Sequence, residues 1–161
     1  MTSYADADFA GDIPSYRSTS GSIIMLADGP ISWKSKKQHQ VVTSTTEAEF
    51  LAITAATKTT IYLRDLAIDL KLLEQQPIDM YNDNQGAVKI ATDEMSIQRT
   101  RHMGAQLGFA REAHSNGIIN IKHCPASKQL ADIFTKPLNR YNFESNRGNI
   151  MKKLLLQGAP T

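Results

Sequence analysis

The stretch that decides the fold is Ser44-Thr45-Thr46-Glu47-Ala48-Glu49-Phe50-Leu51-Ala52-Ile53. Its S/T-x-x-E pattern is a capping box, which begins a helix. Phe50 and Ile53 share an inward stripe of that helix, and Glu49 lies at the edge of the stripe. A carboxylate there is costly unless a cation meets it, and a metal ion would do so. These ten residues alone favour the other interpretation, an ordinary capping box followed by a surface glutamate, so the rest of the chain has to decide between the two.

Length and composition limit the kind of protein. The 161 residues, 41% of them hydrophobic, suit one domain over 1–161 with a proper core. A net charge of +2 gives no global basic field, so a polyanion would be met by a local patch. The single Cys124 excludes an internal disulfide framework and fits a reducing compartment. No signal peptide or span of about 18 apolar residues is evident, which predicts a soluble, intracellular protein without a membrane segment.

The first third of the chain predicts an antiparallel meander. Tyr4–Ala10 alternates as a strand and places two aspartates on one face. Ser22–Leu26 and Ile31–Lys37 are two further strands, and turns are expected at Ser18–Gly21 and at Asp28–Pro30. One face of the third strand is rich in lysine, which is typical of a solvated edge strand and also suits a rim that faces phosphates.

The remaining two thirds predict helices alternating with two strands. We expect helices from Thr45 to about 70, over 87–91, over 106–115, after a Ser127 cap, and over about 139–156. The strands are Ile78–Tyr81 and Ile118–Lys122. The predicted fold is therefore α/β, with a mixed five-stranded sheet of three antiparallel strands and two parallel additions, flanked by helices.

Four acidic residues occupy special places in this scheme. Asp6 lies on the first strand, Glu49 near the start of the long helix, Asp83 at the end of the fourth strand, and Asp132 in the helix after the fifth. Together they suit two divalent cations about 3.5–4 Å apart, an arrangement that aligns a phosphodiester for in-line displacement. For Asp83 the alternative is an Asx turn or a helix N-cap.

From Tyr4 to about Leu138 the chain resembles the ribonuclease H domain at the C-terminal end of copia-type (Pseudoviridae) retrotransposon reverse transcriptases. The resemblance rests on seven motifs that occur in the same order as in the family. The first four are Asp6-Ala7-Asp8-Phe9-Ala10-Gly11-Asp12, Arg17-Ser18-Thr19-Ser20-Gly21, Ile31-Ser32-Trp33-Lys34-Ser35-Lys36-Lys37-Gln38 and Ser44-Thr45-Thr46-Glu47-Ala48-Glu49. The last three are Asp83-Asn84-Gln85, Arg99-Thr100-Arg101-His102 and Gln129-Leu130-Ala131-Asp132-Ile133-Phe134-Thr135-Lys136-Pro137-Leu138. It implies the ribonuclease H fold and endonucleolytic hydrolysis of the RNA strand of RNA/DNA hybrids during reverse transcription. Two Mg²⁺ or Mn²⁺ ions would be the cofactors.

The resemblance assigns roles position by position. The positions that match the family's metal-binding and catalytic carboxylates are Asp6, Glu49, Asp83 and Asp132. His123 falls roughly where cellular ribonucleases H carry a mobile histidine, although a structural or solvated histidine is the alternative there. The positions expected to contact the hybrid are Ser44, Thr45, Thr46, Asn84, Gln85, Lys34, Lys36, Arg99 and Arg101.

The implied setting is a polyprotein. The expected partners are the RNA/DNA hybrid and the polymerase domain of the same reverse transcriptase, and the isolated domain is expected to be monomeric. The implied location is the cytoplasm, in a virus-like particle, and the nucleus at integration. The alternative function is a weak or inactive module of the same fold that binds the hybrid or supports the polymerase. An integrase-type strand transferase fits poorly, because there the glutamate comes from a late helix.

Overall fold

The computed structural model describes residues 1–93 and 104–151, so the predicted contacts Arg99 and Arg101 lie outside the described residues. In chain order the elements are β1 (Thr2–Asp12), β2 (Arg17–Leu26), β3 (Gly29–Lys37), α1 (Thr45–Asp69), β4 (Ile78–Asn82), α2 (Gln85–Thr92), α3 (Gly104–Ser115), β5 (Ile119–His123), the 3₁₀ helices η3 (Ala126–Lys128) and η4 (Leu130–Phe134), and α4 (Arg140–Ile150). The sheet order is β3-β2-β1-β4-β5. The pairs β1–β2 and β2–β3 are antiparallel, whereas β1–β4 and β4–β5 are parallel, which confirms the predicted mixed sheet.

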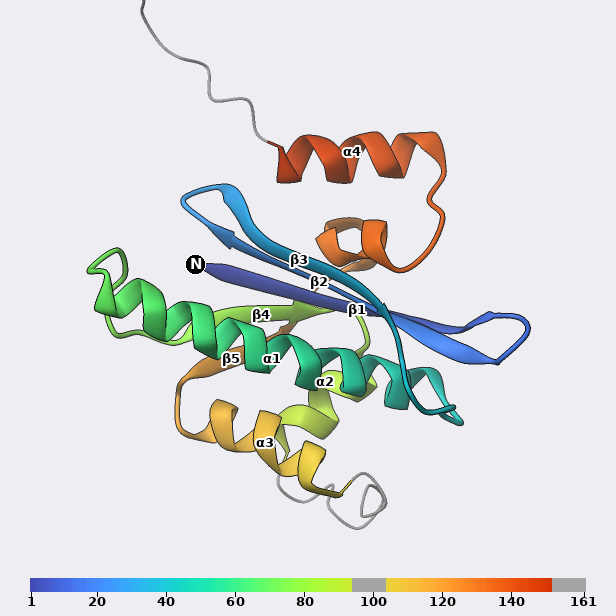
Figure 1. The fold of residues 1–161 in the computed structure, drawn as a ribbon, viewed down its shortest axis with the longest axis horizontal. Coiled ribbons are helices and arrows are strands. Elements are labelled where there is room, and N and C mark those ends of the chain that lie inside the picture. The colour runs from blue at the N-terminus through green and yellow to red at the C-terminus, as the bar shows by residue number, and fades with distance from the viewer. Residues whose placement is uncertain (94–103, 152–161) are drawn as a thin grey trace, which may run out of the picture.

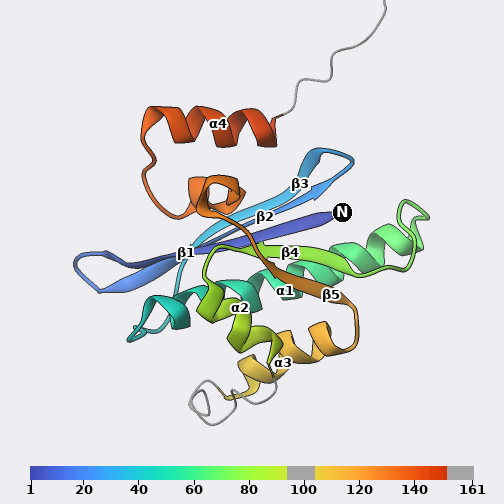
Figure 2. The same cartoon turned by 180° about the vertical axis from the view of Figure 1, so that it is seen from behind.

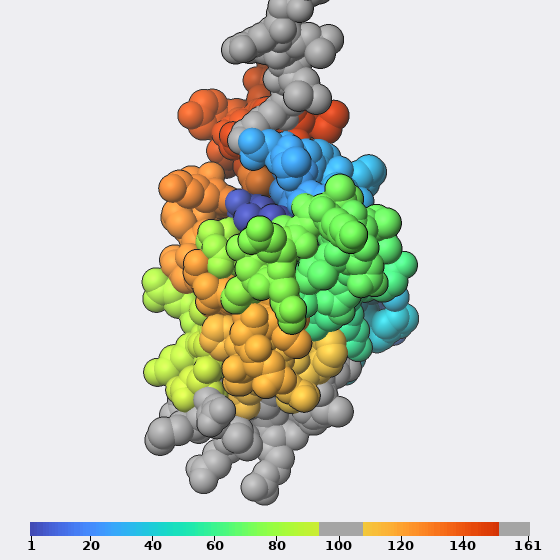
Figure 3. Space-filling view, turned by 90° about the vertical axis from the view of Figure 1, so that its left-hand side faces the viewer, coloured from blue at the N-terminus to red at the C-terminus, as the bar shows by residue number. Residues whose placement is uncertain are grey.

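Helices cover both faces of the sheet. Figures 1 and 2 show α1, α2 and α3 on one face, and η4 with α4 on the other. The larger part of the core fills the first interface, where Phe50 and Ile53 of α1 meet Met80 of β4. A smaller cluster on the other face joins Ile23 of β2 to Ile150 of α4. In Figure 3 the C-terminal end of α1, in green, lies beside the β2–β3 hairpin, in blue, with α4 in red above them.

Alternation along β1 separates the two faces. Ala5 and Ala7 are buried in the clusters beneath α1. Their neighbour Asp6 points to the opposite face, because successive side chains of a strand alternate. Asp6 is nevertheless 0% exposed, since η4 and its C-terminal end cover it. The sheet thus buries a carboxylate at its centre.

The N-terminus of α1 forms as the capping box predicts. Ser44 Oγ accepts a hydrogen bond from the backbone N–H of Glu47 at 3.1 Å. Glu47 in turn accepts from the backbone N–H of Thr43, one residue earlier than the usual box partner. The helix continues for 25 residues without a break. Its first turns bury Glu49, which is 7% exposed, so the inward position of this carboxylate is confirmed and the surface alternative is wrong.

The structure corrects three local predictions. Ser18–Gly21 is not a turn but part of the β2 ladder, because the small residues there accommodate contacts from η4 rather than bend the chain. The β2–β3 turn is centred on Ala27 and Asp28, which both adopt positive φ. After β5 the chain forms two 3₁₀ helices instead of one α-helix, and Gln129 caps the second of them where Ser127 was expected to cap.

The C-terminal helix α4 packs on the η4 face through buried Asn146 and Ile150. It spans Arg140–Ile150, whereas the sequence predicts a helix to about 156, and residues 152–161 lie outside the described residues. Within the described residues, no helix combines the length and the apolar character that crossing a membrane requires.

Gly21 should be indispensable for packing η4 on the sheet. A Cβ there would lie 2.6 Å from Thr135 Cγ2 and 2.9 Å from the carbonyl oxygen of Ala131. We therefore expect Gly21→Ala to lower the free energy of unfolding by about 1–3 kcal/mol, because backbone would have to shift. Gly29→Ala is the matched control, since its Cβ would meet only Leu26 O at 3.8 Å. Equal denaturant midpoints for the two variants would contradict this packing.

Candidate metal centre

Three aspartates from distant parts of the chain meet on the η4 face of the sheet. Each of Asp6, Asp83 and Asp132 offers a carboxylate oxygen, and these oxygens all lie within 4.8 Å of one another. Asp6 is buried in the middle of β1, Asp132 is 8% exposed in η4, and Asp83 is partly buried directly after β4. Three negative side chains therefore share one small space.

The chain turns sharply after β4, and this turn presents Asp83. The Asn82 Oδ1 atom accepts a hydrogen bond from the backbone N–H of Asn84, which makes an Asx turn. Asn84 then caps α2 by accepting from the backbone N–H of Ala87. The alternative roles for Asp83 were an Asx turn and a helix N-cap. Asn82 makes the turn and Asn84 makes the cap, so the side chain of Asp83 is available for another role.

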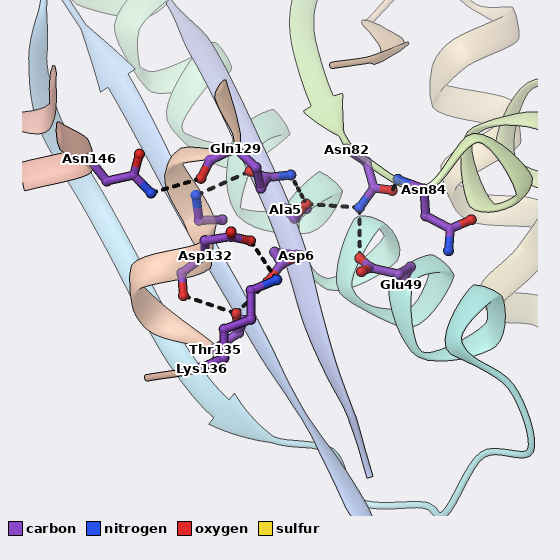
Figure 4. A network of polar contacts seen from close by, with 11 residues as sticks. Ala5, Asp6, Glu49, Asn82, Asn84, Gln129, Asp132, Thr135, Lys136 and Asn146 are labelled. Atoms are coloured by element: carbon purple, nitrogen blue, oxygen red, sulfur yellow. Dashed lines mark hydrogen bonds and ion pairs between the residues drawn. The ribbon is translucent and has the colours of Figure 1, made fainter. Parts of the chain in front are cut away.

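Two side-chain amides hold the acidic residues together around one backbone carbonyl. Pairing of β1 with β4 ends at Tyr4, and the next carbonyl, that of Ala5, accepts from Asn82 Nδ2 at 2.8 Å and from Gln129 Nε2 at 2.9 Å. Gln129 also caps η4 and accepts at its own carbonyl from Asn146 of α4 (Figure 4). The network connects β1, β4, η4 and α4 next to Asp6.

The C-terminal end of η4 brings a hydroxyl and an ammonium into the cluster. Thr135 donates a short hydrogen bond from Oγ1 to Asp6 Oδ2. Lys136 Nζ lies 2.9 Å from Asp132 Oδ1 and 3.8 Å from Asp6 Oδ2. Figure 4 shows Thr135 and Lys136 together beside the two aspartates. One positive charge therefore faces several negative ones.

Glu49 lies beside this cluster, outside the three oxygens that lie within 4.8 Å. Its Oε2 accepts from Asn82 Nδ2 at 2.9 Å. Burial raises the pKa of Glu49 to about 9, the negative charges of Asp6 and Asp83 add to the rise, and the hydrogen bond from Asn82 opposes it. The Glu49 carboxyl group is thus close enough for the charges of Asp6 and Asp83 to raise its pKa. It is held in place by Asn82, the same amide that positions the cluster.

Asp83, Asp132 and Lys136 also have perturbed pKa values. Burial raises the pKa of Asp83, and the charge of Asp6 raises it further. Burial raises the pKa of Asp132 to about 6, although the hydrogen bond from Lys136 opposes the rise. Burial alone would lower the pKa of Lys136, but Asp132 and Asp6 raise it. Burial is the main cause for the two aspartates, and the neighbouring negative charges account for the raised pKa of Lys136.

The arrangement fits a hard divalent cation. Mg²⁺ and Mn²⁺ prefer carboxylate oxygens, which all three aspartates supply. Asp6 Oδ1 is buried and has no hydrogen-bond partner among the described residues, so one ligand atom is left without compensation. The residues that could hold such an ion are Asp6, Asp83 and Asp132, with Glu49 at their edge.

The other predicted site residues have varied positions. Ser44, Thr45 and Thr46 form the first turn of α1, where Ser44 and Thr45 are exposed. Gln85 is exposed at the start of α2, and His123 is exposed at the end of β5, where the register pairs it with Asn82. Lys34 and Lys36 are not brought to the acidic cluster, since β3 is two strands away from β1.

Sequence reasoning missed four residues that build the site: Asn82, Gln129, Thr135 and Lys136. Their signal was their position, because Asn82 precedes Asp83, and the other three lie within four residues of Asp132. Single polar residues at such places are common in turns and caps, so the sequence alone did not distinguish them.

Comparison with known proteins places this fold and site in context. The chain is 36% identical over 145 residues to a retrovirus-related Pol polyprotein from transposon RE2 of Arabidopsis thaliana, which covers 90% of this chain and 10% of the relative. It is 33% identical over 144 residues to the Pol polyprotein of transposon TNT 1-94 of Nicotiana tabacum, which covers 89% of this chain and 11% of the relative. The chain is homologous to a segment of retrotransposon Pol polyproteins. It spans about a tenth of their length.

Solved structures confirm the architecture of this chain. RNase H1 from Halobacterium salinarum superposes with a TM-score of 0.55 at 19% identity, over 83% of this chain and 92% of that one. LC11-RNase H1, isolated from compost, gives a TM-score of 0.56 at 16% identity, over 83% and 91%. The predicted ribonuclease H fold and the resemblance to copia-type Pol are therefore confirmed. No family model matches the chain.

The pH dependence of stability should report the buried Glu49. Unfolded Glu49 loses its proton near 4.5, whereas the folded residue keeps it to about 9, so the native state binds more protons between these values. Its stabilising contribution is present below pH 4.5 and is lost as pH rises through about 9, at most about 1.4 kcal/mol per pH unit. Glu49→Gln should flatten this slope in denaturant unfolding with EDTA.

Asp132→Asn is the matched comparison. Its carboxyl has an ordinary pKa of 3.8 and a folded pKa of about 6, so this variant should flatten only that narrower window. A Glu49→Gln protein that loses stability between pH 6 and 9 as steeply as the wild type would contradict the assignment.

Proposed function

We propose that this Pol segment is a divalent-metal-dependent endonuclease that hydrolyses the RNA strand of RNA/DNA hybrids. The observation that carries the proposal is the meeting of Asp6, Asp83 and Asp132 within 4.8 Å on a ribonuclease H fold. Glu49 adds a fourth carboxylate at the edge of the same space. Two bound Mg²⁺ or Mn²⁺ ions would lower the pKa of an attacking water and stabilise the leaving oxygen.

The helix starts beside the cluster suit the phosphates of a substrate. The N-termini of α1 and α2 approach each other, since a Cβ on Gly86 of α2 would lie 3.2 Å from Oγ1 and 3.3 Å from Cγ2 of Thr46 of α1. Free backbone N–H groups and the helix dipole favour anions at such ends. Ser44 and Thr45 are exposed, so their hydroxyl groups could contact the same phosphates of the nucleic-acid substrate. Gln85 starts α2 and could contact the minor groove, whose 2′-hydroxyls distinguish RNA from DNA.

His123 would act at the rim of this site. It is exposed at the end of β5, beside the turn that carries Asp83, and its positive charge would lower the pKa of Asp83. An exposed histidine there can exchange a proton with solvent or with a departing product.

A non-catalytic module that holds the hybrid or supports the polymerase domain is the second candidate. Lys136 favours it, because the ammonium already compensates part of the carboxylate charge without any metal. Calorimetric titration with Mn²⁺ separates the candidates, since a non-catalytic module has no need to bind the ion.

In either case, the partner in the polyprotein would be the polymerase domain, and the cellular setting would be the virus-like particle.

Replacement of Asp83 tests the nuclease directly. Asp83→Asn should reduce Mg²⁺-dependent cleavage of a labelled hybrid by at least about a hundredfold, because loss of a metal-binding carboxylate should cost at least as much as loss of an outer-shell partner. Asp79→Asn is the control: Asp79 lies on β4 and pairs with exposed Lys122, outside the cluster. Cleavage that continues in EDTA, or equal rates for both variants, would refute the proposal.

Replacement of Lys136 tests whether its ammonium competes with the cation. Lys136→Met should bind Mn²⁺ several-fold more tightly, because the cluster then has more uncompensated negative charge. In EDTA the same variant should be less stable by roughly 1 kcal/mol, a modest cost because the lysine is partly exposed. Lys122→Met, which removes a surface partner of Asp79, is the matched control. Unchanged or weaker Mn²⁺ binding in calorimetry would show that no competition occurs.

A further inference from the structure

A second charged feature lies on the opposite side of the sheet from the aspartates. A groove of about 400 Å³ runs between the edge strand β3 and helix α1. Four lysines and one histidine line it, and neither Asp nor Glu is among its lining residues: Lys34, Lys36, Lys37, Lys58 and His39. The chain as a whole has a net charge of only +2, so this concentration of one sign is local.

The register of the sheet determines which way these lysines point. Lys34 pairs with Ser22, which pairs with Ala5, and Ala5 is buried beneath α1. Residues directly opposite one another in a ladder share a face, so Lys34 and Lys36 project on the α1 side. Asp6 is in register with Gly21, which pairs with Ser35 between the two lysines. The backbone of β3 between the two lysines is therefore about 10 Å from that of Asp6, across two strand spacings, and the lysine side chains project on the other face.

The lysine side chains are available to a ligand. Both Lys34 and Lys36 are exposed, and no described carboxylate lies within ion-pair distance of either one. Lys37 is different, because its Nζ lies 2.7 Å from Asp12 Oδ1. Lys58 of α1 lies across the groove, with its Nζ 5.8 Å from the centre of the Phe109 ring.

Protection of the free edge of β3 would account for lysines but not for the groove. Lysine on an edge strand discourages pairing with another chain and needs only solvent around it. Here the same lysines border a hollow whose wall carries the small polar side chains Ser20, Ser22 and Thr54, together with the α1 surface. The floor of the hollow is largely apolar, with Leu51, Ala52 and Ala55 among its lining residues, so the charges lie at its rim. Cationic side chains along such a rim are suited to an extended anion with regularly spaced charges.

We propose that the β3–α1 groove binds the phosphodiester backbone of nucleic acid as a second contact, separate from the acidic cluster. Lys34 and Lys36 are two residues apart on a β-strand, about 6.8 Å, which matches the axial distance between phosphates two nucleotides apart, at about 3.4 Å per nucleotide. The groove opens at the free edge of the sheet, so a strand can enter it without displacing another element. The proposal extends the proposed function, since it names a further part of the same polyanionic ligand.

Binding in EDTA tests the groove without cleavage. Fluorescence anisotropy would follow a labelled 20-base-pair RNA/DNA hybrid and a single-stranded DNA of equal length over a series of salt concentrations. For Lys34→Gln with Lys36→Gln, the slope of log K against log salt should fall in magnitude by about 2 on the duplex and about 1.4 on the single strand. A change on both probes indicates the backbone alone, and a change on the duplex alone indicates a paired ligand. Either result supports the proposal.

The matched control removes the same charge elsewhere. Lys71→Gln with Lys128→Gln changes two exposed lysines, one beyond the C-terminus of α1 and one in η3. Equal slopes for the two double variants would overturn the proposal, as would a poly-glutamate chain that displaces both probes at equal charge concentration. If the wild-type protein did not cleave the hybrid in Mg²⁺ but the slope change were still found, only the nuclease would be refuted. The two failures can therefore be told apart.

Discussion

The structure of the site depends on one backbone carbonyl. Ala5 is the first residue of β1 beyond its ladder with β4, and its carbonyl accepts from the side-chain amides of Asn82 and Gln129. A buried carbonyl without partners would cost roughly 1–3 kcal/mol, so the two amides are fixed there. Asn82 immediately precedes Asp83, Gln129 caps η4, which carries Asp132, and Asp6 follows Ala5 along β1. The same hydrogen bonds that stabilise the sheet therefore assemble the cluster.

The acidic cluster concentrates negative charge at the centre of the sheet. The pKa values of Glu49, Asp83 and Asp132 are all raised, first by burial and then by the neighbouring charges of one another and of Asp6. Lys136 offsets part of this charge from a single ammonium group. Such local destabilisation is typical of functional sites, where packing of the surrounding structure holds side chains in an arrangement that is unfavourable by itself.

The two faces of the sheet differ in charge. The η4 face buries carboxylates beneath 3₁₀ helices, while the α1 face presents lysines at the free edge of β3. Strand alternation produces this division, since Asp6 and the lysines flanking Ser35 lie at neighbouring register positions but on opposite sides. A chain with almost no net charge can thereby carry a strongly negative site and a strongly positive groove.

The order of the five strands and the capping of α1 by Ser44 could be predicted from the sequence, because alternation and capping chemistry act over a few neighbouring residues. The burial of Glu49 could not be predicted from its own stretch, which also suits a surface glutamate after a capping box. The sequence did not predict that Ser18–Gly21 pairs in β2, because small residues that make room for η4 resemble the residues of a turn. Only the tertiary structure decided that Asp6, Asp83 and Asp132 meet while Glu49 stands beside them on Asn82. Those contacts join residues up to 129 positions apart, and no local pattern encodes the amides and the threonine that fix them.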